Sequence, residues 1–420
     1  MCTSYGAAFC PPPPVDEDVA DSRSVGVVVG VLQLVLLALV ALSFLGTLFS
    51  HAFAWYYFAS YDRRFPRREY APPVSVIKPV KGVDQSASGN FRGFCEQDYP
   101  SDYEVVFCVE GRDDPSVPVI ERVIEEYPDR DVRLIFSDPE DARSVGKLKN
   151  MIAGYAHSSY EVIVFSDSDA QVPPNFLRET VACLEIPEVG LGFGAPAYVG
   201  ARDWAAALMA FSANPFVLRL ASMCLFRAFD GAVGTTMVVR REAIECVGGL
   251  ERFGRHITDD LPLGRALREE GYHIHLLKQP ACVSHPHYTF GRWWTQMHRW
   301  LVTIRCYWPN NFLITSAVDL APWWALLYLL VSLLAGDGIV FGACLLAAAL
   351  GTPLVSQAVV NARFVKEEGL WRYLWVVLVH EAVRLALVLY AAFTDEVVWR
   401  GRRMRVASDG TVELVGRELR

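Results

Sequence analysis

Two carboxylates stand two residues apart, at Asp167 and Asp169, in the segment VIVFSDSDAQVPPNF. They follow an apolar run of β-branched and aromatic residues that is typical of a buried strand. Because Asp is a common turn residue, a solvated turn is one interpretation of the pair. The other is a metal site, since oxygen ligands favour a hard divalent ion, Mg²⁺ or Mn²⁺, that commonly bridges to substrate phosphates.

Other charged residues along the chain have types that bind phosphates or move protons. Asp113 and Asp114 follow a second apolar run, and Lys147 opens an expected helix in the segment SVGKLKN. A helix start with a lysine attracts anions, although the same pattern occurs as a plain exposed helix end. Asp259 and Asp260 precede another helical pattern, where they are either functional carboxylates or N-terminal caps.

Alternating strands and helices are expected to position these residues. Strands are predicted at 74–80, 103–111, 131–137 and 160–169, and helices at 117–127 and 147–157. This alternation predicts an α/β fold with a mainly parallel sheet flanked by helices. Ligands of such sheets bind beyond the carboxyl ends of the strands. We therefore expect Asp113, Asp114, Asp167 and Asp169 to converge on one rim, where a divalent cation would offset their mutual repulsion.

An apolar run near the N-terminus predicts a membrane anchor. Residues 25–50 contain no charged side chain and are long enough to span a bilayer. The acidic residues before this run argue against a cleaved signal peptide, which would begin with basic residues. Arginines at 63, 64, 67 and 68 follow it, and basic residues stay on the cytoplasmic side.

Three apolar runs follow near the C-terminus. Residues 317–335 and 339–360 predict an antiparallel helical pair. Residues 373–393 carry His380, Glu381 and Arg384, and ionisable groups are costly inside a bilayer. This third run is therefore interpreted either as a re-entrant or interfacial helix or as a membrane-spanning helix.

These runs divide the chain into four parts. We expect an acidic, Pro-rich tail at 1–24, a transmembrane anchor at 25–58, a cytoplasmic catalytic domain at 72–305, and a membrane region with two or three hydrophobic helices and a basic tail at 306–420. The chain is thus expected to be a multi-pass protein of a bacterial inner membrane or a Golgi membrane.

One apolar segment inside the expected catalytic domain is interrupted. Residues 204–229 are apolar except at a few positions, among them Asn214, Pro215 and Arg219. Proline breaks a helix at this point, so two short helices are expected. They either lie against the membrane and admit a lipid, or form part of a buried core.

Composition excludes several other classes of function. The formal net charge of −8 gives no basic surface for nucleic acid. The ten cysteines are scattered without zinc-like spacing, so they are interpreted as small apolar residues.

Taken in order, the charged motifs resemble a known family. The segments SVIKPVKGVD, EQDYPSDYEVVFCVEGRDDPS, VGKLKN, SDSD, ITDD and QMHRW are similar to those of the membrane glycosyltransferases of the ceramide glucosyltransferase family. Bacterial hopanoid glycosyltransferases share most of this pattern. The resemblance covers about residues 73–305, is loose over 190–229, and returns in the C-terminal segment WRGRRMRVASDGTVEL.

The resemblance implies a GT-A fold that binds a UDP-sugar and transfers one sugar, with inversion, to the hydroxyl of a membrane lipid. UDP-glucose is the expected donor and ceramide the expected acceptor. Asp167 and Asp169 would hold Mg²⁺ or Mn²⁺, and Asp260 would be the catalytic base, with Asp259 as the alternative. The implied donor-binding residues are Asp113, Asp114, Lys147, Asp167, Gln296, Arg299 and Trp300.

Other functions stay open at this point. A hopanoid or a diacylglycerol also offers a hydroxyl, and the loose match over 190–229 leaves the acceptor undecided. A processive polysaccharide synthase shares the aspartates and the Gln296–Arg299–Trp300 motif, but it would need more spanning helices. A non-catalytic membrane scaffold would be expected to have lost some of the acidic sites, all of which are present.

Overall fold

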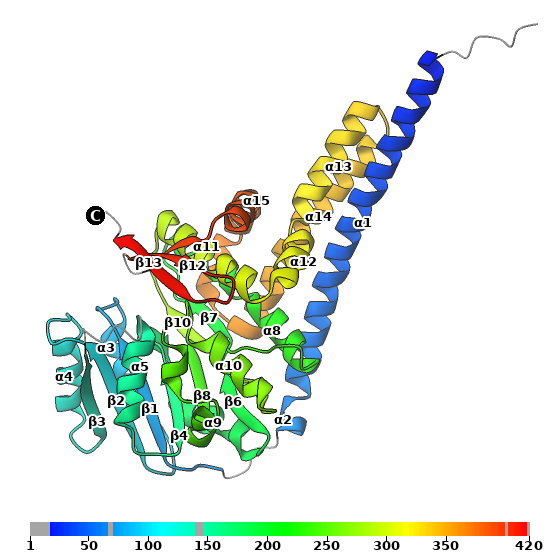
Figure 1. Cartoon of the computed structure of the whole chain (residues 1–420). Coiled ribbons are helices and arrows are strands. Elements are labelled where there is room, and N and C mark those ends of the chain that lie inside the picture. The colour runs from blue at the N-terminus through cyan, green and yellow to red at the C-terminus, as the bar shows by residue number, and fades with distance from the viewer. Residues whose placement is uncertain (1–16, 66–69, 139–145, 400–401, 418–420) are drawn as a thin grey trace, which may run out of the picture.

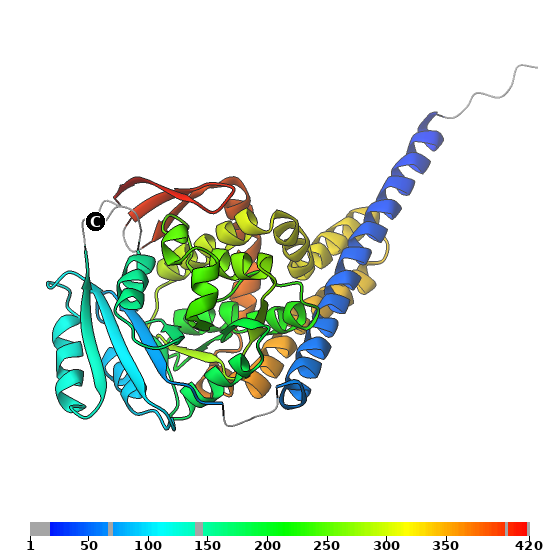
Figure 2. The same ribbon diagram turned by 60° about the horizontal axis from the view of Figure 1, so that its bottom comes forward.

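The computed structural model describes residues 17–65, 70–138, 146–399 and 402–417. A layered α/β body carries a long N-terminal helix and a helical hairpin that project from one side (Figures 1 and 2). A small C-terminal sheet lies against the body. The Pro-rich segment, Arg67 and Arg68 lie outside the described residues.

A seven-stranded sheet forms the centre of the body, in the order β3-β2-β1-β4-β8-β6-β9. Its strands are β1 (Val74–Val80), β2 (Tyr103–Glu110), β3 (Asp131–Ser137), β4 (Val162–Ser166), β6 (Val189–Phe193), β8 (Thr236–Arg240) and β9 (His273–Leu276). All neighbouring strands pair parallel except β8, which is antiparallel to both β4 and β6. The predicted mainly parallel sheet is confirmed, and β1 to β4 match the predicted segments.

Helices cover both faces of this sheet. Successive strand residues point to opposite faces, so Val76 packs with Phe91 on one side, while Ile77 packs with Met151 on the other. This burial on both sides explains why β1 and β4 have no exposed residue and are mostly apolar. The helices of the body include α3 (Ala87–Cys95), α4 (Val117–Glu126), α5 (Lys147–Ala156), α6 (Phe176–Val181), α9 (Arg241–Cys246) and α10 (Asp260–Glu269).

A second, three-stranded sheet stands beside the carboxyl end of β4. It contains β5 (Ala170–Gln171), β10 (Ala281–Ser284) and β7 (Pro196–Val199), with β10 in the middle. Because β5 follows Asp169 directly, this sheet fixes the chain just after the Asp-Ser-Asp turn.

The apolar runs at the two ends of the chain pack together. α1 (Glu17–Ala59) lies beside the hairpin of α13 (Ala321–Ala335) and α14 (Ile339–Val360), and Figure 1 shows the axes of the three helices aligned. Gln33 of α1 donates a hydrogen bond to Asp337 in the hairpin turn. The predicted antiparallel pair is confirmed, although α12 (Pro309–Asp319) takes up the first residues of the expected run and meets α13 at a bend of 54°.

The described residues contain four helical segments long and apolar enough to cross a membrane. They are Gly26–Ala59, Trp204–Leu225, Ile339–Val365 and Val376–Phe393, and the bent pair of α12 and α13 would make a fifth. Of these, α15 (Val376–Phe393) is seen end-on in Figure 1, so it lies across the direction of α1, α13 and α14. This placement agrees with the interpretation of residues 373–393 as a re-entrant or interfacial helix.

The interrupted segment forms two helices, as predicted from Pro215. α7 (Trp204–Ala213) is almost wholly buried against α11 (Phe290–Tyr307) and α15, so it follows the core interpretation. α8 (Phe216–Leu225) packs beside α1 and is only partly buried.

The basic segment after α15 folds into an antiparallel sheet, which the sequence analysis did not predict. Its strands are β11 (Glu396–Trp399), β12 (Arg402–Val406) and β13 (Val412–Arg417). Met404 and Val412 pack into the main core, so this sheet is part of the body.

Candidate active site

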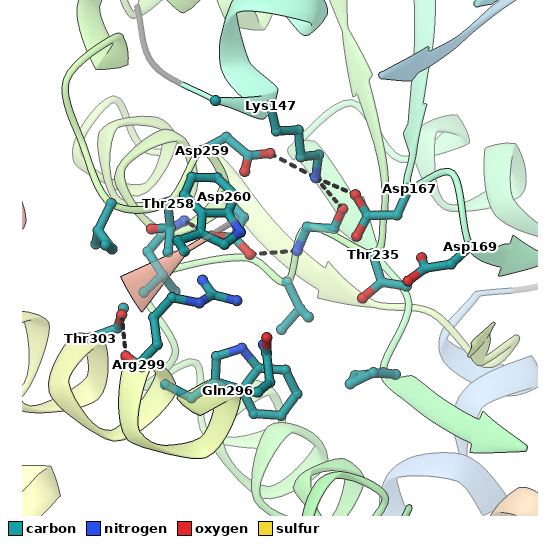
Figure 3. A pocket seen from close by; sticks show the side chains of 18 of the residues that line it. Lys147, Asp167, Asp169, Thr235, Thr258, Asp259, Asp260, Gln296, Arg299 and Thr303 are labelled. Carbon is teal, nitrogen blue, oxygen red and sulfur yellow. Dashed lines mark hydrogen bonds and ion pairs between the residues drawn. The ribbon is translucent and has the colours of Figure 1, made fainter. Parts of the chain in front are cut away.

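The Asp-Ser-Asp turn lies where β4 ends, beneath a large cavity (Figure 3). Asp167 N donates to Thr235 O at 3.0 Å, which ties the turn to the segment before β8. Lys78, fully buried in β1, donates from Nζ to Asp167 O at 2.8 Å. Burial lowers the pKa of Lys78 to about 7, against the pull of the two carboxylates. The turn is thus held through the main-chain N–H and C=O groups of Asp167.

Lys147 connects the two pairs of aspartates. Its Nζ lies 2.8 Å from Asp167 Oδ1 and 3.1 Å from Asp259 Oδ2, and it donates to Gly234 O at 2.8 Å. Burial by itself would lower the pKa of Lys147, but Asp167 and Asp259 outweigh it and raise that pKa above its usual value. Lys147 therefore stays protonated and shares its positive charge between one carboxylate of each pair. Figure 3 shows it pointing between them.

Asp259 and Asp260, at the start of α10, have different surroundings. Asp260 Oδ2 accepts from Gly234 N at 2.5 Å, and Oδ1 accepts from Leu261 N at 2.8 Å. Burial, with Asp259 beside it, raises the pKa of Asp260 to about 6. Asp260 is therefore close to the ideal pKa of a proton acceptor near neutral pH.

The motif Gln296–Arg299–Trp300 lies on α11 and faces the cavity. With its amide oxygen placed toward the two donors, Gln296 accepts from Trp300 Nε1 at 2.6 Å and Arg299 Nη2 at 2.7 Å. No carboxylate among the described residues lies within ion-pair distance of Arg299. Its guanidinium lies 5.3 Å from the centre of the Trp399 ring, on β11. Gln296 thus orients the other two residues, and Arg299 offers an unneutralised positive charge.

Asp169 faces a histidine that the sequence analysis did not single out. His285 Nε2 lies 2.9 Å from Asp169 Oδ2. Burial would raise the pKa of Asp169, but His285 outweighs it and holds that pKa below its usual value. Burial raises the pKa of Asp167 to about 6, against the attraction of Lys147.

This donor set fits a divalent ion that is shared with a substrate. Among the described residues, no group of three or more His, Cys, Asp or Glu is placed to hold a metal on its own. Mg²⁺ and related ions are usually bound by one or two carboxylates together with substrate phosphates. Asp167 and Asp169 supply such carboxylates, and the hydrogen bond from His285 would orient the carboxylate of Asp169.

Asp113 and Asp114 lie at the same edge of the sheet, next to the loop after β1. Asp113 is exposed and Asp114 half-buried, and neither lines the cavity. Asp114 accepts from Gly82 N at 3.0 Å and from Ser116 N at 2.9 Å, so its oxygens satisfy the loop after β1 and the start of α4. A donor-binding role for these two aspartates stays a prediction.

The cavity has a volume of about 780 Å³ and two chemically different ends. One end lies at the carboxyl ends of β1, β2 and β4 and is polar. The other end lies between α8, α11 and α12 and is mostly apolar. The polar end includes Lys81, Asp84, Glu110, Lys147, Asp167 and Asp169; the apolar end includes Phe216, Leu220, Met223, Phe229, Ile304 and Trp308.

The C-terminal sheet closes the cavity above the start of α5. Trp399, Arg402 and Met404 line it. A methyl group on Gly146 would lie 2.8 Å from the Trp399 ring, so the ring rests directly on the backbone before Lys147. The apolar and basic pattern of this segment was visible in the sequence, but nothing local indicated that it would reach the site.

Comparison with known proteins places the chain in a family. The model of glycosyl transferase family 21 matches residues 33–412. The chain belongs to that family. It is therefore a glycosyltransferase, and its apolar helices make it a membrane protein, as the resemblance implied.

Curated relatives of this family member carry the same kind of name. Ceramide glucosyltransferase 1 of Caenorhabditis elegans is 22% identical over 81% of this chain and 73% of its own length. Ceramide glucosyltransferase 3 of the same species is 26% identical over 60% of this chain, which spans about half (54%) of that relative. The ceramide glucosyltransferase of Komagataella phaffii is 29% identical over 31% of this chain and 27% of its own length.

Glycosyltransferases of known structure are less similar to this chain in sequence. The mannosyltransferase PcManGT of Pyrobaculum calidifontis, in complex with GDP-Man and Mn²⁺, is 19% identical and covers 84% of this chain and 97% of its own, with a TM-score of 0.43. Glucosyl-3-phosphoglycerate synthase of Mycobacterium tuberculosis is 17% identical over 55% of this chain and 79% of its own, with a TM-score of 0.34.

Proposed function

We propose that this glycosyltransferase moves a single glucose from UDP-glucose to the hydroxyl of a membrane lipid such as ceramide, with inversion at the sugar. The observation that carries the proposal is the two-ended cavity. Its polar end suits a nucleoside diphosphate, and its apolar end suits a lipid. The paired aspartates at the start of α10 line the same cavity, beside Lys147.

The polar end is suited to the departure of the diphosphate. A divalent ion held by Asp167 and Asp169 would supply positive charge to the leaving phosphates. Arg299, which no carboxylate of the described part of the chain neutralises, would bind the same group. Lys147 keeps its proton and lies between Asp167, at the sugar-donor end, and Asp259, at the start of α10. Donor-binding roles for Asp113, Asp114 and Trp300 are part of the same proposal.

Asp260 is the proposed base. The acceptor hydroxyl attacks the anomeric carbon while the bond from that carbon to the diphosphate oxygen breaks, and the electron pair leaves with UDP. The hydroxyl proton passes to Asp260. Attack from the side opposite the leaving group inverts the anomeric centre, as in inverting hydrolysis. Asp259 is the less suitable base, because Lys147 neutralises it at 3.1 Å.

Other acceptors and a processive reaction remain alternatives. A hopanoid or a diacylglycerol would also fit an apolar end that holds a hydroxyl. A polysaccharide synthase has to pass its polymer through the membrane, and four or five apolar helical segments in the described chain are few for that. The cytoplasmic placement of the catalytic domain, at residues 72–305, belongs to the proposal, because nucleotide sugars are made in the cytoplasm.

Transfer of radioactive glucose by isolated membranes tests the proposal. Membranes containing the chain should form one labelled glycolipid from UDP-glucose, carrying a single sugar. A labelled polymer would favour the processive synthase, and the absence of any labelled product would contradict the proposal.

A further inference from the structure

A network of charged side chains lies beside the apolar end of the cavity, outside the site described above. Arg219 of α8 pairs with both carboxylate oxygens of Asp319, the last residue of α12. Arg384 of α15 lies 3.0 Å from Asp319 Oδ2 and 3.3 Å from Glu381 Oε1. His380 Nδ1 lies 3.1 Å from the same Glu381 oxygen. The network therefore joins α8 and α12, which border the apolar end, to α15 behind them.

Within this network Arg219 lines the cavity, whereas Arg384 does not. Its side chain is 38% exposed, and its neighbours on the cavity wall are Phe216, Leu220 and Met223. Only Nη2 makes a hydrogen bond within the described chain. The guanidinium has five N–H groups, so those on Nε and Nη1 have no acceptor among the described residues.

These N–H groups of Arg219 need hydrogen-bond acceptors when a lipid fills the apolar end of the cavity. A lipid chain beside Arg219 displaces water, and a buried polar group without a hydrogen bond is costly. The bound acceptor lipid therefore has to supply an oxygen atom next to the guanidinium of Arg219.

The charge of the network decides which kind of oxygen this is. Arg219 and Arg384 carry two positive charges, and Asp319 and Glu381 carry two negative ones. These charges cancel, so Arg219 suits a neutral carbonyl better than a phosphate. Asn311 of α12 lines the same end, and no hydrogen bond of its side-chain amide occurs among the described residues, so it could pair with an amide group.

We infer that Arg219 forms a subsite for a carbonyl group of the acceptor lipid, held in place by Asp319. This inference rests on the proposed function and narrows it. The acceptor is an acylated lipid with an amide or ester carbonyl close to its reacting hydroxyl, such as a ceramide or a diacylglycerol. A hopanoid alcohol, which has no carbonyl there, would leave the N–H groups of Arg219 without partners.

Acceptor discrimination by the purified full-length chain tests this subsite. We would measure kcat/KM with a ceramide, a diacylglycerol and a long-chain primary alcohol, all with UDP-glucose as donor. In the parent, kcat/KM should be higher for the preferred one of the two acylated lipids than for the alcohol. Arg219→Met should lower that ratio by about 10- to 100-fold, the size expected for a hydrogen bond to a charged group.

Arg384→Met is the matched control, because it disturbs the same network away from the cavity wall. It should keep the parent ratio even if it lowers thermal stability. An unchanged ratio in Arg219→Met, or an equal loss of ratio in both variants, would show that the network is only structural and overturn the subsite. A parent that glucosylates none of the three lipids would overturn the proposed function itself.

In the parent, preference for ceramide over diacylglycerol identifies the amide as the recognised group, and the reverse preference identifies the ester; either supports a carbonyl subsite. Equal use of the alcohol and the better acylated lipid by the parent would contradict it.

Discussion

Two adjacent aspartates at the start of α10 differ in what they are able to do. Asp259 is paired with Lys147, while Asp260 accepts only main-chain hydrogen bonds and has a pKa raised by burial to about 6. Asp260→Asn keeps the shape of the side chain and removes the proton acceptor. We expect transfer to fall by about 10²- to 10⁴-fold, the usual contribution of a general base, with UDP binding nearly unchanged.

Asp259→Asn is the matched variant and should be milder. Transfer rates and UDP binding by calorimetry separate the two roles. Loss of UDP binding in Asp260→Asn would move that residue to the donor site, and a parental transfer rate would mean that the base lies elsewhere.

The same carboxyl predicts how transfer depends on pH. A base works in its ionised form, and the pKa of Asp260, raised by burial, is about 6. The value of kcat/KM should therefore be constant above about pH 7 and fall as the pH drops through 6, approaching tenfold per pH unit. Burial also raises the pKa of Asp167 to about 6. A pH profile of Asp260→Asn distinguishes them, because a fall that persists in this variant belongs to Asp167.

The Asp-Ser-Asp turn predicts dependence on a divalent metal. We expect EDTA to stop transfer and Mg²⁺ or Mn²⁺ to restore it, because the carboxylates of this turn suit a hard ion shared with phosphates. Asp169→Ala should abolish transfer while the thermal unfolding temperature stays close to that of the parent. Asp98→Ala, an exposed aspartate away from the cavity, is the control. Full activity in Asp169→Ala would leave the turn without a metal-binding role.

At the scale of elements, the C-terminal sheet completes the active site. Trp399 of β11 contacts the backbone at Gly146 and stacks on Arg299, so it connects the start of α5 with α11. We expect Trp399→Ala to lower kcat/KM for the sugar donor by about 3- to 30-fold, the range of a partly buried cation–π contact. Steady-state kinetics with varied donor measures it.

Trp371→Ala removes an exposed tryptophan that does not line the cavity, and it should leave those kinetics unchanged. An equal effect of both substitutions would mean that Trp399 acts through stability alone.

At the scale of the whole molecule, the proposed orientation in the membrane is testable. α1 and the α13–α14 hairpin lie side by side, so the hairpin turn and the domain that bears the sheet should face opposite sides. In a background from which all ten native cysteines have been removed, Cys2 and Cys10 of the N-terminal tail included, we would place single cysteines at Glu121 on α4 and at Asp337 in the turn. An impermeant maleimide should label Asp337→Cys in intact cells and Glu121→Cys only after permeabilisation. Strong labelling of Glu121→Cys in intact cells would contradict a cytoplasmic catalytic domain.

Hydrophobic patterns along the chain predict the strands and helices that bury their own side chains. Strands β1 to β4 and helices α4, α5 and α10 follow from apolar runs, periodicity and the residues at their ends, because each depends on burial of its own side chains. The ordered motifs were also local, and they were enough to indicate the family that the comparison then showed. Pro215 predicted the break between α7 and α8 for the same reason.

Contacts between segments far apart in the sequence became visible only in the folded chain. His285 meets Asp169 across 116 residues, Trp399 reaches Arg299 from the far end of the chain, and β8 enters the sheet antiparallel to its neighbours. Both carboxylate oxygens of Asp114 accept from Gly82 N in the loop after β1, 32 residues away. Such contacts depend on how packed elements are placed relative to one another, and no local periodicity encodes that placement.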